Sequence, residues 1–185
     1  ALDDAQWMDV IAASFDTWTD IPDTKLSFRE TDLELDSDSL KNLVWFESSW
    51  QDDPDTGAIA SMWVEDNTLV GFDIRINADT IAWSIDGSAT DAQAAITHEI
   101  GHAIGVGHSN VEAATMYFEI LGDDTLQRSL EPDDVRAVTH LYSHRVLGVP
   151  EFLSCNTASS TSRSPWAAVG LLALFRRRRH TETRP

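Results

Sequence analysis

Hydrophobic and polar positions follow a helical period at the start of this chain. The pattern predicts an amphipathic helix over residues 3–20, with one face packed against a core. Asp3 and Asp4 suit the N-terminal end of this helix, where the backbone dipole favours negative charge. Pro22 follows as a stop signal. The apolar face consists of Trp7, Ile11, Phe15 and Trp18.

The next part of the chain is predicted to form β-strands. Four segments are rich in Val, Ile, Phe and Trp, at residues 25–31, 41–50, 58–65 and 69–77. Asp66 and Asn67 separate the last two segments and predict a hairpin turn. The loop 51–57 is acidic and carries Pro and Gly. It is either a solvated turn or a calcium-binding loop.

A second helix is expected from about Asp91 to Ile104. Thr90 followed by Gln93 matches a capping box at its start. Gly105 marks its end, because glycine adopts the left-handed conformation that closes a helix.

A third helix is expected over residues 132–143. Pro132 suits its first position, and Asp133 and Asp134 favour its positive end. Its apolar face consists of Val135, Val138 and Tyr142. Strands followed by helices predict an α+β fold, with a twisted mixed sheet and three helices.

Composition and charge limit the kinds of binding partner and metal site that the chain can have. The chain has 185 residues and a formal net charge of −18, so nucleic acid is excluded as a partner, since phosphate binding needs clustered Lys and Arg. Cys155 is the only cysteine, which rules out an intrachain disulfide and a Cys-rich zinc site. A transition-metal site must therefore use His and carboxylate ligands.

Residues 98–108 carry the candidate chemistry. His98 and His102 lie four residues apart, so a helix places both imidazoles on one face, where they can bind one metal ion. Gly105 lets the chain turn so that His108 supplies a third nitrogen. Three protein ligands leave one position open, as in catalytic zinc sites. Glu99 is then the general base for a zinc-activated water.

Two other interpretations of this motif must be weighed. A bare His-Glu-x-x-His pattern is a weak signal, but the form extended by a glycine and a third His is far more specific. A non-catalytic binding module could keep the metal for structure, although the intact Glu99 argues against it. A membrane-embedded protease is disfavoured because no long apolar stretch surrounds His98.

Residues 98–108 resemble the metzincin motif, and Ser109 resembles the matrixin branch, the matrix-metalloproteinase-like peptidases. Residues 114–117 resemble the Met-turn of that family, which implies that Met116 forms an apolar floor beneath the metal ligands. Residues 130–135 and 141–142 resemble the closing helix of the family. The resemblance covers roughly residues 3–143 and implies a zinc-dependent endopeptidase with its zinc site on the second helix.

The sequence also departs from the family pattern. No His precedes His98, so the structural zinc site of the family has no ligands here, and the propeptide cysteine is absent. The first strand of the family is missing, which suggests that Ala1 begins inside the domain. Phe118 and Ile120 replace the usual Pro and Tyr and put the shape of the main specificity pocket in doubt. Calcium could instead be held by Asp73, Asn77 and Asp79.

The resemblance implies a polypeptide substrate. We expect the cleft between an edge strand near residues 58–64 and the segment around Met116, because an extended peptide can pair with such an edge. The enzyme is expected to be a monomer, and secreted or attached to the cell surface.

The chain changes character after the closing helix. We assign residues 1–149 to the catalytic domain, 150–164 to a Ser/Thr-rich linker and 165–185 to a hydrophobic tail that includes Arg176–Arg179. With Cys155, this tail resembles a myxobacterial-type C-terminal sorting signal that contacts a membrane or sorting machinery. Its apolar run is shorter than the roughly 20 residues of a membrane span, so an amphipathic or disordered tail is the alternative.

Overall fold

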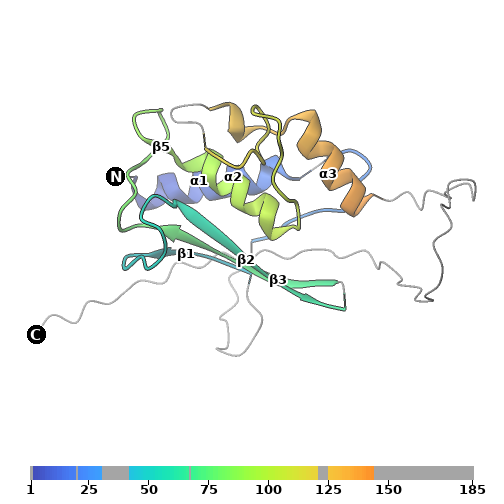
Figure 1. Ribbon diagram of the computed structural model, residues 1–185, viewed down its shortest axis with the longest axis horizontal. Helices are drawn as coiled ribbons and strands as arrows, with labels where there is room; N and C mark the ends of the chain where they lie inside the picture. The colour runs from blue at the N-terminus through green and yellow to red at the C-terminus, as the bar shows by residue number, and fades with distance from the viewer. Residues whose placement is uncertain (1, 20, 31–41, 67, 121–124, 144–185) are drawn as a thin grey trace, which may run out of the picture.

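The computed structural model describes residues 2–19, 21–30, 42–66, 68–120 and 125–143. A mixed β-sheet forms one layer, and the α-helices lie over one of its faces (Figure 1). The elements in chain order are α1 (Asp4–Thr17), β1 (Leu43–Glu47), β2 (Ala58–Glu65), β3 (Thr68–Asn77), β4 (Trp83–Ser84), β5 (Thr90–Asp91), α2 (Ala92–Ala103), the 3₁₀ helix η1 (Leu126–Arg128) and α3 (Pro132–Tyr142). The expected α+β fold, with a mixed sheet and three α-helices, is confirmed.

The main sheet has the strand order β1-β3-β2. β1 runs parallel to β3, with Val44 opposite Ile74, and β2 runs antiparallel to β3, with Ala60 opposite Ile74. The predicted hairpin joins β2 to β3, and Asp66 adopts a positive φ of 48° at its turn. Within the described chain β2 is therefore an edge strand, as the sequence predicts.

The core lies between β3 and the helices. Phe72, Ile74 and Ile76 alternate along β3 and are fully buried on the face toward α1 and α2. Ile96, Ile100 and Ile104 from α2 and the C-terminal turn that follows it fill the same core. The site-bearing helix is thus fixed by apolar burial along its length.

The first helix is shorter than the expected 3–20. Asp3 is its N-cap, and the Asp3 carboxylate accepts a hydrogen bond from the Gln6 backbone N–H while the Gln6 side chain accepts one from the Asp3 backbone N–H. Trp18 lies at the C-cap and is fully buried, and its Nε1–H donates to the Thr97 carbonyl at 2.8 Å. This bond fastens the end of α1 to the middle of α2.

The N-terminal cap of α2 differs from the prediction. Asp91, not Thr90, is the N-cap, and its carboxylate accepts from the Ala94 backbone N–H at 2.8 Å. Asp91 is fully buried and also forms an ion pair with Arg128 on η1. An aspartate at Ncap satisfies a free N–H of the first turn, and the ion pair supplies the charge partner that burial requires. Gly105 ends the helix region with φ of +91°, as predicted.

The strand expected at residues 25–31 is wrong for its described part. Residues 25–30 lie outside every strand, although Thr24 forms an isolated bridge with Ser143. Leu26 is buried and Phe28 packs edge-on against Phe15. The apolar residues of this segment therefore pack on the core without belonging to a strand. The short ladder of β4 with β5 has no counterpart in the prediction.

Several predictions lie outside the described residues. These concern the end of the domain at residue 149, the linker 150–164, the tail 165–185 and Cys155. Among the described residues, no helix has both the length and the apolar character needed to cross a membrane.

Candidate metal centre and active site

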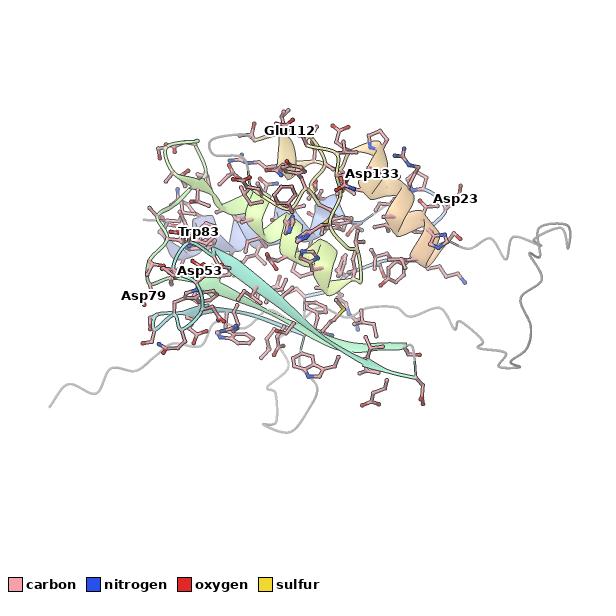
Figure 2. All side chains as sticks on the ribbon, viewed as in Figure 1. Asp23, Asp53, Asp79, Trp83, Glu112 and Asp133 are labelled. Carbon is pink, nitrogen blue, oxygen red and sulfur yellow. The ribbon has the colours of Figure 1, made fainter. Side chains whose placement is uncertain are left out.

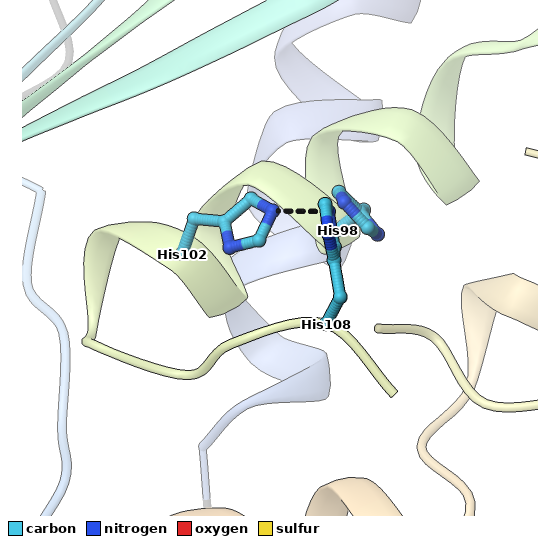
Figure 3. Close-up of side chains that lie close together, drawn as sticks. All are labelled: His98, His102 and His108. Atoms are coloured by element: carbon cyan, nitrogen blue, oxygen red, sulfur yellow. Dashed lines mark hydrogen bonds between the residues drawn. The ribbon is translucent and has the colours of Figure 1, made fainter. Parts of the chain in front are cut away.

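The three predicted histidines converge at one point (Figure 3). His98 and His102 project from successive turns of α2, and the chain reverses at Gly105 to bring His108 back against them. The ligating nitrogens all lie within 4.8 Å of one another, and the Nε2 atoms of His102 and His108 are 3.0 Å apart. Within the described residues this is the only His, Cys, Asp and Glu cluster that fits a metal ion.

Backbone carbonyls fix two of these rings. His98 Nδ1 lies 2.8 Å from the Thr115 carbonyl oxygen, and His102 Nδ1 lies 2.9 Å from the Val106 carbonyl oxygen. A carbonyl accepts only, so each Nδ1 carries the proton and each Nε2 presents a lone pair. Second-shell bonds of this kind orient metal-binding histidines. The donor set, three imidazole nitrogens, suits Zn²⁺.

Burial favours the neutral imidazoles that a metal ion requires. It lowers the pKa of His98 to about 4, and the neighbouring His102 and His108 add to this effect while the bond to Thr115 opposes it. Burial also lowers the pKa of His102. Both shifts favour the deprotonated, metal-binding form near neutral pH.

Glu99 lies beside the histidines and contacts the edge strand. Its Oε2 accepts a hydrogen bond from the Ala60 backbone N–H of β2 at 2.6 Å. Burial raises the pKa of Glu99 to about 7, although the Ala60 bond opposes the shift. A carboxyl group with a pKa near the working pH is suited to accept and return a proton. The bond also holds the carboxylate between α2 and β2.

Met116 lies under the histidines in a space that Gly101 leaves open. Met116 is buried, and a Cβ added to Gly101 would overlap its Sδ atom and lie 2.8 Å from Cζ2 of Trp18. The glycine between His98 and His102 thus permits close approach of a methionine and a tryptophan to the metal-binding turn. The role of Met116 as an apolar floor, which the resemblance implies, stays a prediction.

Comparison with known proteins shows to which family the chain belongs. The matrixin peptidase family matches residues 1–143. The chain belongs to the matrixin family. It is similar to karilysin of Tannerella forsythia, with 45% identity over 62 residues, which are 34% of this chain and 12% of that protein. It is also similar to metalloendoproteinase 1-MMP of Arabidopsis thaliana, with 33% identity over 147 residues, which are 75% of this chain and 35% of that protein.

Rat matrilysin is a further relative, with 43% identity over 49 residues, which are 26% of this matrixin and 18% of matrilysin. The alignments with these three proteins therefore cover from 12% to 35% of the relatives' own lengths.

A buried aspartate joins the Met-turn of this matrixin to α3. Asp134 Oδ2 accepts from the backbone N–H groups of Thr115 and Glu131, each at 2.9 Å, and Oδ1 accepts from the Met116 N–H at 3.1 Å. From the sequence, Asp134 is expected only to stabilise the positive, N-terminal end of the helix. Its bonds to the Met-turn have no local sequence signal, because the donors are backbone groups 18 and 19 residues away.

Two cavities flank the metal-binding residues. One, of about 390 Å³, opens beside His98 and Glu99, between the start of β2 and residues 118–120. This is close to the cleft that the sequence predicts between the edge strand and the segment around Met116. The other, of about 290 Å³, lies on the far side of His108 against α3.

The proposed calcium ligands are already engaged with the protein. The Asn77 side chain donates to Thr56 and Thr80, and its Oδ1 accepts from the backbone N–H groups of Asp79 and Thr80. Asp79 accepts from the Trp50 N–H at 3.1 Å, and Figure 2 shows Asp79 at the same end of the sheet as Asp53. The Asn77 side chain therefore helps to hold loop 51–57 to the end of β3 through the Thr56 carbonyl. Calcium binding stays a prediction, and these contacts do not support it.

Proposed function

We propose that this matrixin is a zinc-dependent endopeptidase, with zinc bound by His98, His102 and His108 and with Glu99 as general base. The observation that carries the proposal is the convergence of the three imidazoles beside a cavity that Glu99 also lines. Membership of the matrixin family supports it independently.

The chain's own residues account for the proton transfers. Zinc in this site would polarise the scissile carbonyl and lower the pKa of the attacking water toward about 7. Glu99 is held by Ala60 through Oε2, which leaves Oε1 to accept the proton of that water. As the peptide bond breaks, Glu99 returns the proton to the leaving amine, so no covalent enzyme intermediate is needed.

The edge strand supports a polypeptide as substrate. β2 is partnered on one side by β3, and its other side faces the cavity at Ala58. A peptide extended beside β2 would cross the cavity next to Glu99, and backbone pairing of this kind is largely independent of sequence. We extend the proposal to a secreted or cell-surface enzyme that acts as a monomer.

Two substitutions test this function. His102→Ala should strongly weaken zinc binding, and Glu99→Ala should keep the metal while peptide hydrolysis falls about 10²- to 10⁴-fold. Zinc content and turnover are measured on the same preparations, with folding checked by circular dichroism. Undiminished turnover by the Glu99→Ala protein would remove Glu99 from its role. Full zinc occupancy in a variant with His98, His102 and His108 all replaced by Ala would rule out the ligand set.

We also propose that the tail from about Cys155 onward directs the enzyme to the cell surface and takes no part in catalysis. The support is in the sequence: a Ser/Thr-rich linker, an apolar run at 166–175 and the arginines at 176–179. The arginines after an apolar run fit the positive-inside tendency.

Cell fractionation compares the full chain, a truncation after Val149 and Cys155→Ala. The truncated enzyme should retain activity and enter the medium. Identical partitioning of the full and truncated chains contradicts surface anchoring, and loss of activity on truncation contradicts the domain boundary at residue 149.

A further inference from the structure

The cavity beside Glu99 is lined by apolar and polar residues together. Its apolar lining comes from four separate parts of the chain: the start of β2, the segment between β3 and β4, α2 and the segment after the Met-turn. The apolar lining residues are Ala58, Ile81, Ala95, Phe118 and Ile120. Ala58 and Ala95 are buried, and Thr56, Gly57 and Thr90 line the same cavity. The apolar members of this lining offer contacts to a hydrocarbon chain.

Two carboxylates line the same cavity. Asp55, from the acidic loop 51–57, and Glu119, after the Met-turn, are both exposed. Among the described residues, neither carboxylate takes part in a hydrogen bond or an ion pair. The Asp55 backbone N–H donates to the Asp53 carboxylate, and the Glu119 backbone carbonyl accepts from the Gln127 side chain. The other titratable groups facing the cavity are His98 and Glu99, and no described Lys or Arg lines it. Asp55 and Glu119 therefore give the cavity two carboxylates that no described Lys or Arg side chain in its lining neutralises.

We propose that this cavity binds the side chain of a Lys or Arg residue adjacent to the scissile bond, with Asp55 and Glu119 as the specificity-determining residues. The inference rests on the proposed endopeptidase function. A Lys or Arg side chain has an aliphatic stem of three or four methylene groups and a charged end. The stem contacts the apolar residues of the lining, and the ammonium or guanidinium group reaches the exposed carboxylates, where it stays hydrated.

The net charge of the whole chain also favours cationic substrates. A net charge of −18 attracts basic peptides and repels acidic ones at long range. Steering of this kind favours any cationic substrate, however, and does not select a position in the peptide. The positional preference must come from Asp55 and Glu119, and this separates the two effects in an experiment.

Paired peptides provide the test. Each pair differs only in one residue next to the scissile bond, with Lys compared with norleucine, and Arg with citrulline, so that the shape is kept and the charge is removed. The zinc-loaded wild-type enzyme should cleave the cationic member with the higher kcat/KM. In Asp55→Asn and Glu119→Gln the cationic-to-neutral ratio should fall roughly two- to fivefold for each carboxylate removed, since exposed ion pairs are weak.

Glu112→Gln is the matched control. It removes the same unit of charge from an exposed position that lines neither cavity, on the side of the molecule away from the sheet (Figure 2). This variant should keep the wild-type ratio. If the ratio falls equally in the control, the preference arises from overall charge and the assignment to the cavity is wrong.

The remaining outcomes separate this inference from the proposed function. Cleavage with no preference for the cationic peptides overturns the inference and leaves the endopeptidase function standing. Absence of cleavage in every pair overturns the function instead. In that case, binding of the same pairs with an N-methylated central amide, which resists hydrolysis, still decides the inference: equal affinity for charged and neutral members contradicts it.

Discussion

Gly101 lies where an additional methyl group would have no room. Its position between His98 and His102 puts any side chain against Met116 and Trp18. We expect Gly101→Ala to destabilise the fold by about 1–3 kcal/mol, the usual cost of overpacking, and to weaken zinc binding because the helix must shift. Gly107→Ala is the control, since a Cβ there meets nothing within 4 Å. Chemical denaturation and zinc titration of both variants check this, and equal effects would contradict it.

Glu99 makes the metal-free domain less stable as the pH rises. Burial raises the pKa of Glu99 from 4.5 to about 7 in the folded chain. The carboxyl group is neutral in both states below pH 4.5. Between these two values the unfolded chain ionises first, so stability falls as pH rises through this window.

Glu99→Gln should therefore raise the free energy of unfolding of metal-free protein by about 1–3 kcal/mol at pH 8 and by little at pH 4. His98 has the opposite effect on the pH dependence of stability. Its pKa is lowered from 6.5 to about 4 in the folded chain, so the free energy of unfolding falls as the pH drops through that range. Urea denaturation at the two pH values measures the difference. An equal gain at both values would show that the carboxyl charge is not responsible.

At the scale of elements, Asp134 connects α3 to the loop that supports His98. Three backbone N–H groups donate to its two oxygens. Asp134→Asn keeps only one oxygen and turns an amide N–H₂ toward a backbone donor. We expect a loss of about 2–4 kcal/mol, since bonds to charged groups contribute roughly 1.5–3 kcal/mol each.

The same substitution should weaken zinc binding, because the Thr115 carbonyl orients the His98 ring. Asp133→Asn is the neighbouring control, with a more exposed carboxylate that accepts from Ser109 and Arg136. Thermal unfolding and zinc affinity of both variants are compared. A larger effect from the Asp133 substitution would refute the role of Asp134.

The helices were largely predictable because their signals are local. Pro132 starts α3, Gly105 closes α2, and the spacing of His98 and His102 fixes their common face. The cap of α2 was misassigned because Thr90 and Asp91 both suit an N-cap, and what distinguishes them is the ion pair of Asp91 with the distant Arg128. Backbone partners such as the Ala60 N–H and the Thr115 carbonyl carry no sequence signal, so those parts of the site required the structure.

At the scale of the whole molecule, the metal site joins separate parts of the fold. Its ligands come from α2 and the following turn, its floor from the Met-turn, and its support from α1 and α3. Only the folded chain brings the three nitrogens together, so metal binding should stabilise folding by mass action.

Removal of zinc by a chelator should accordingly lower the Tm of the zinc-loaded domain. The same chelator should leave the Tm of His102→Ala almost unchanged. Calorimetry with and without chelator tests this, and an equal decrease in both proteins would mean that the stabilising ion binds elsewhere.

The buried methionine beneath the histidines should be oxidised later than the other methionines of the chain. The chain contains three methionines: Met8 and Met62 are 43% and 46% exposed, whereas Met116 is 1% exposed. Under dilute peroxide, sulfoxides should accumulate on the two exposed residues first, while Met116 reacts only as fast as the site opens locally. Peptide mass spectrometry distinguishes the three positions. Because Met116 is almost fully buried, its oxidation marks molecules in which the metal-binding turn has opened to solvent.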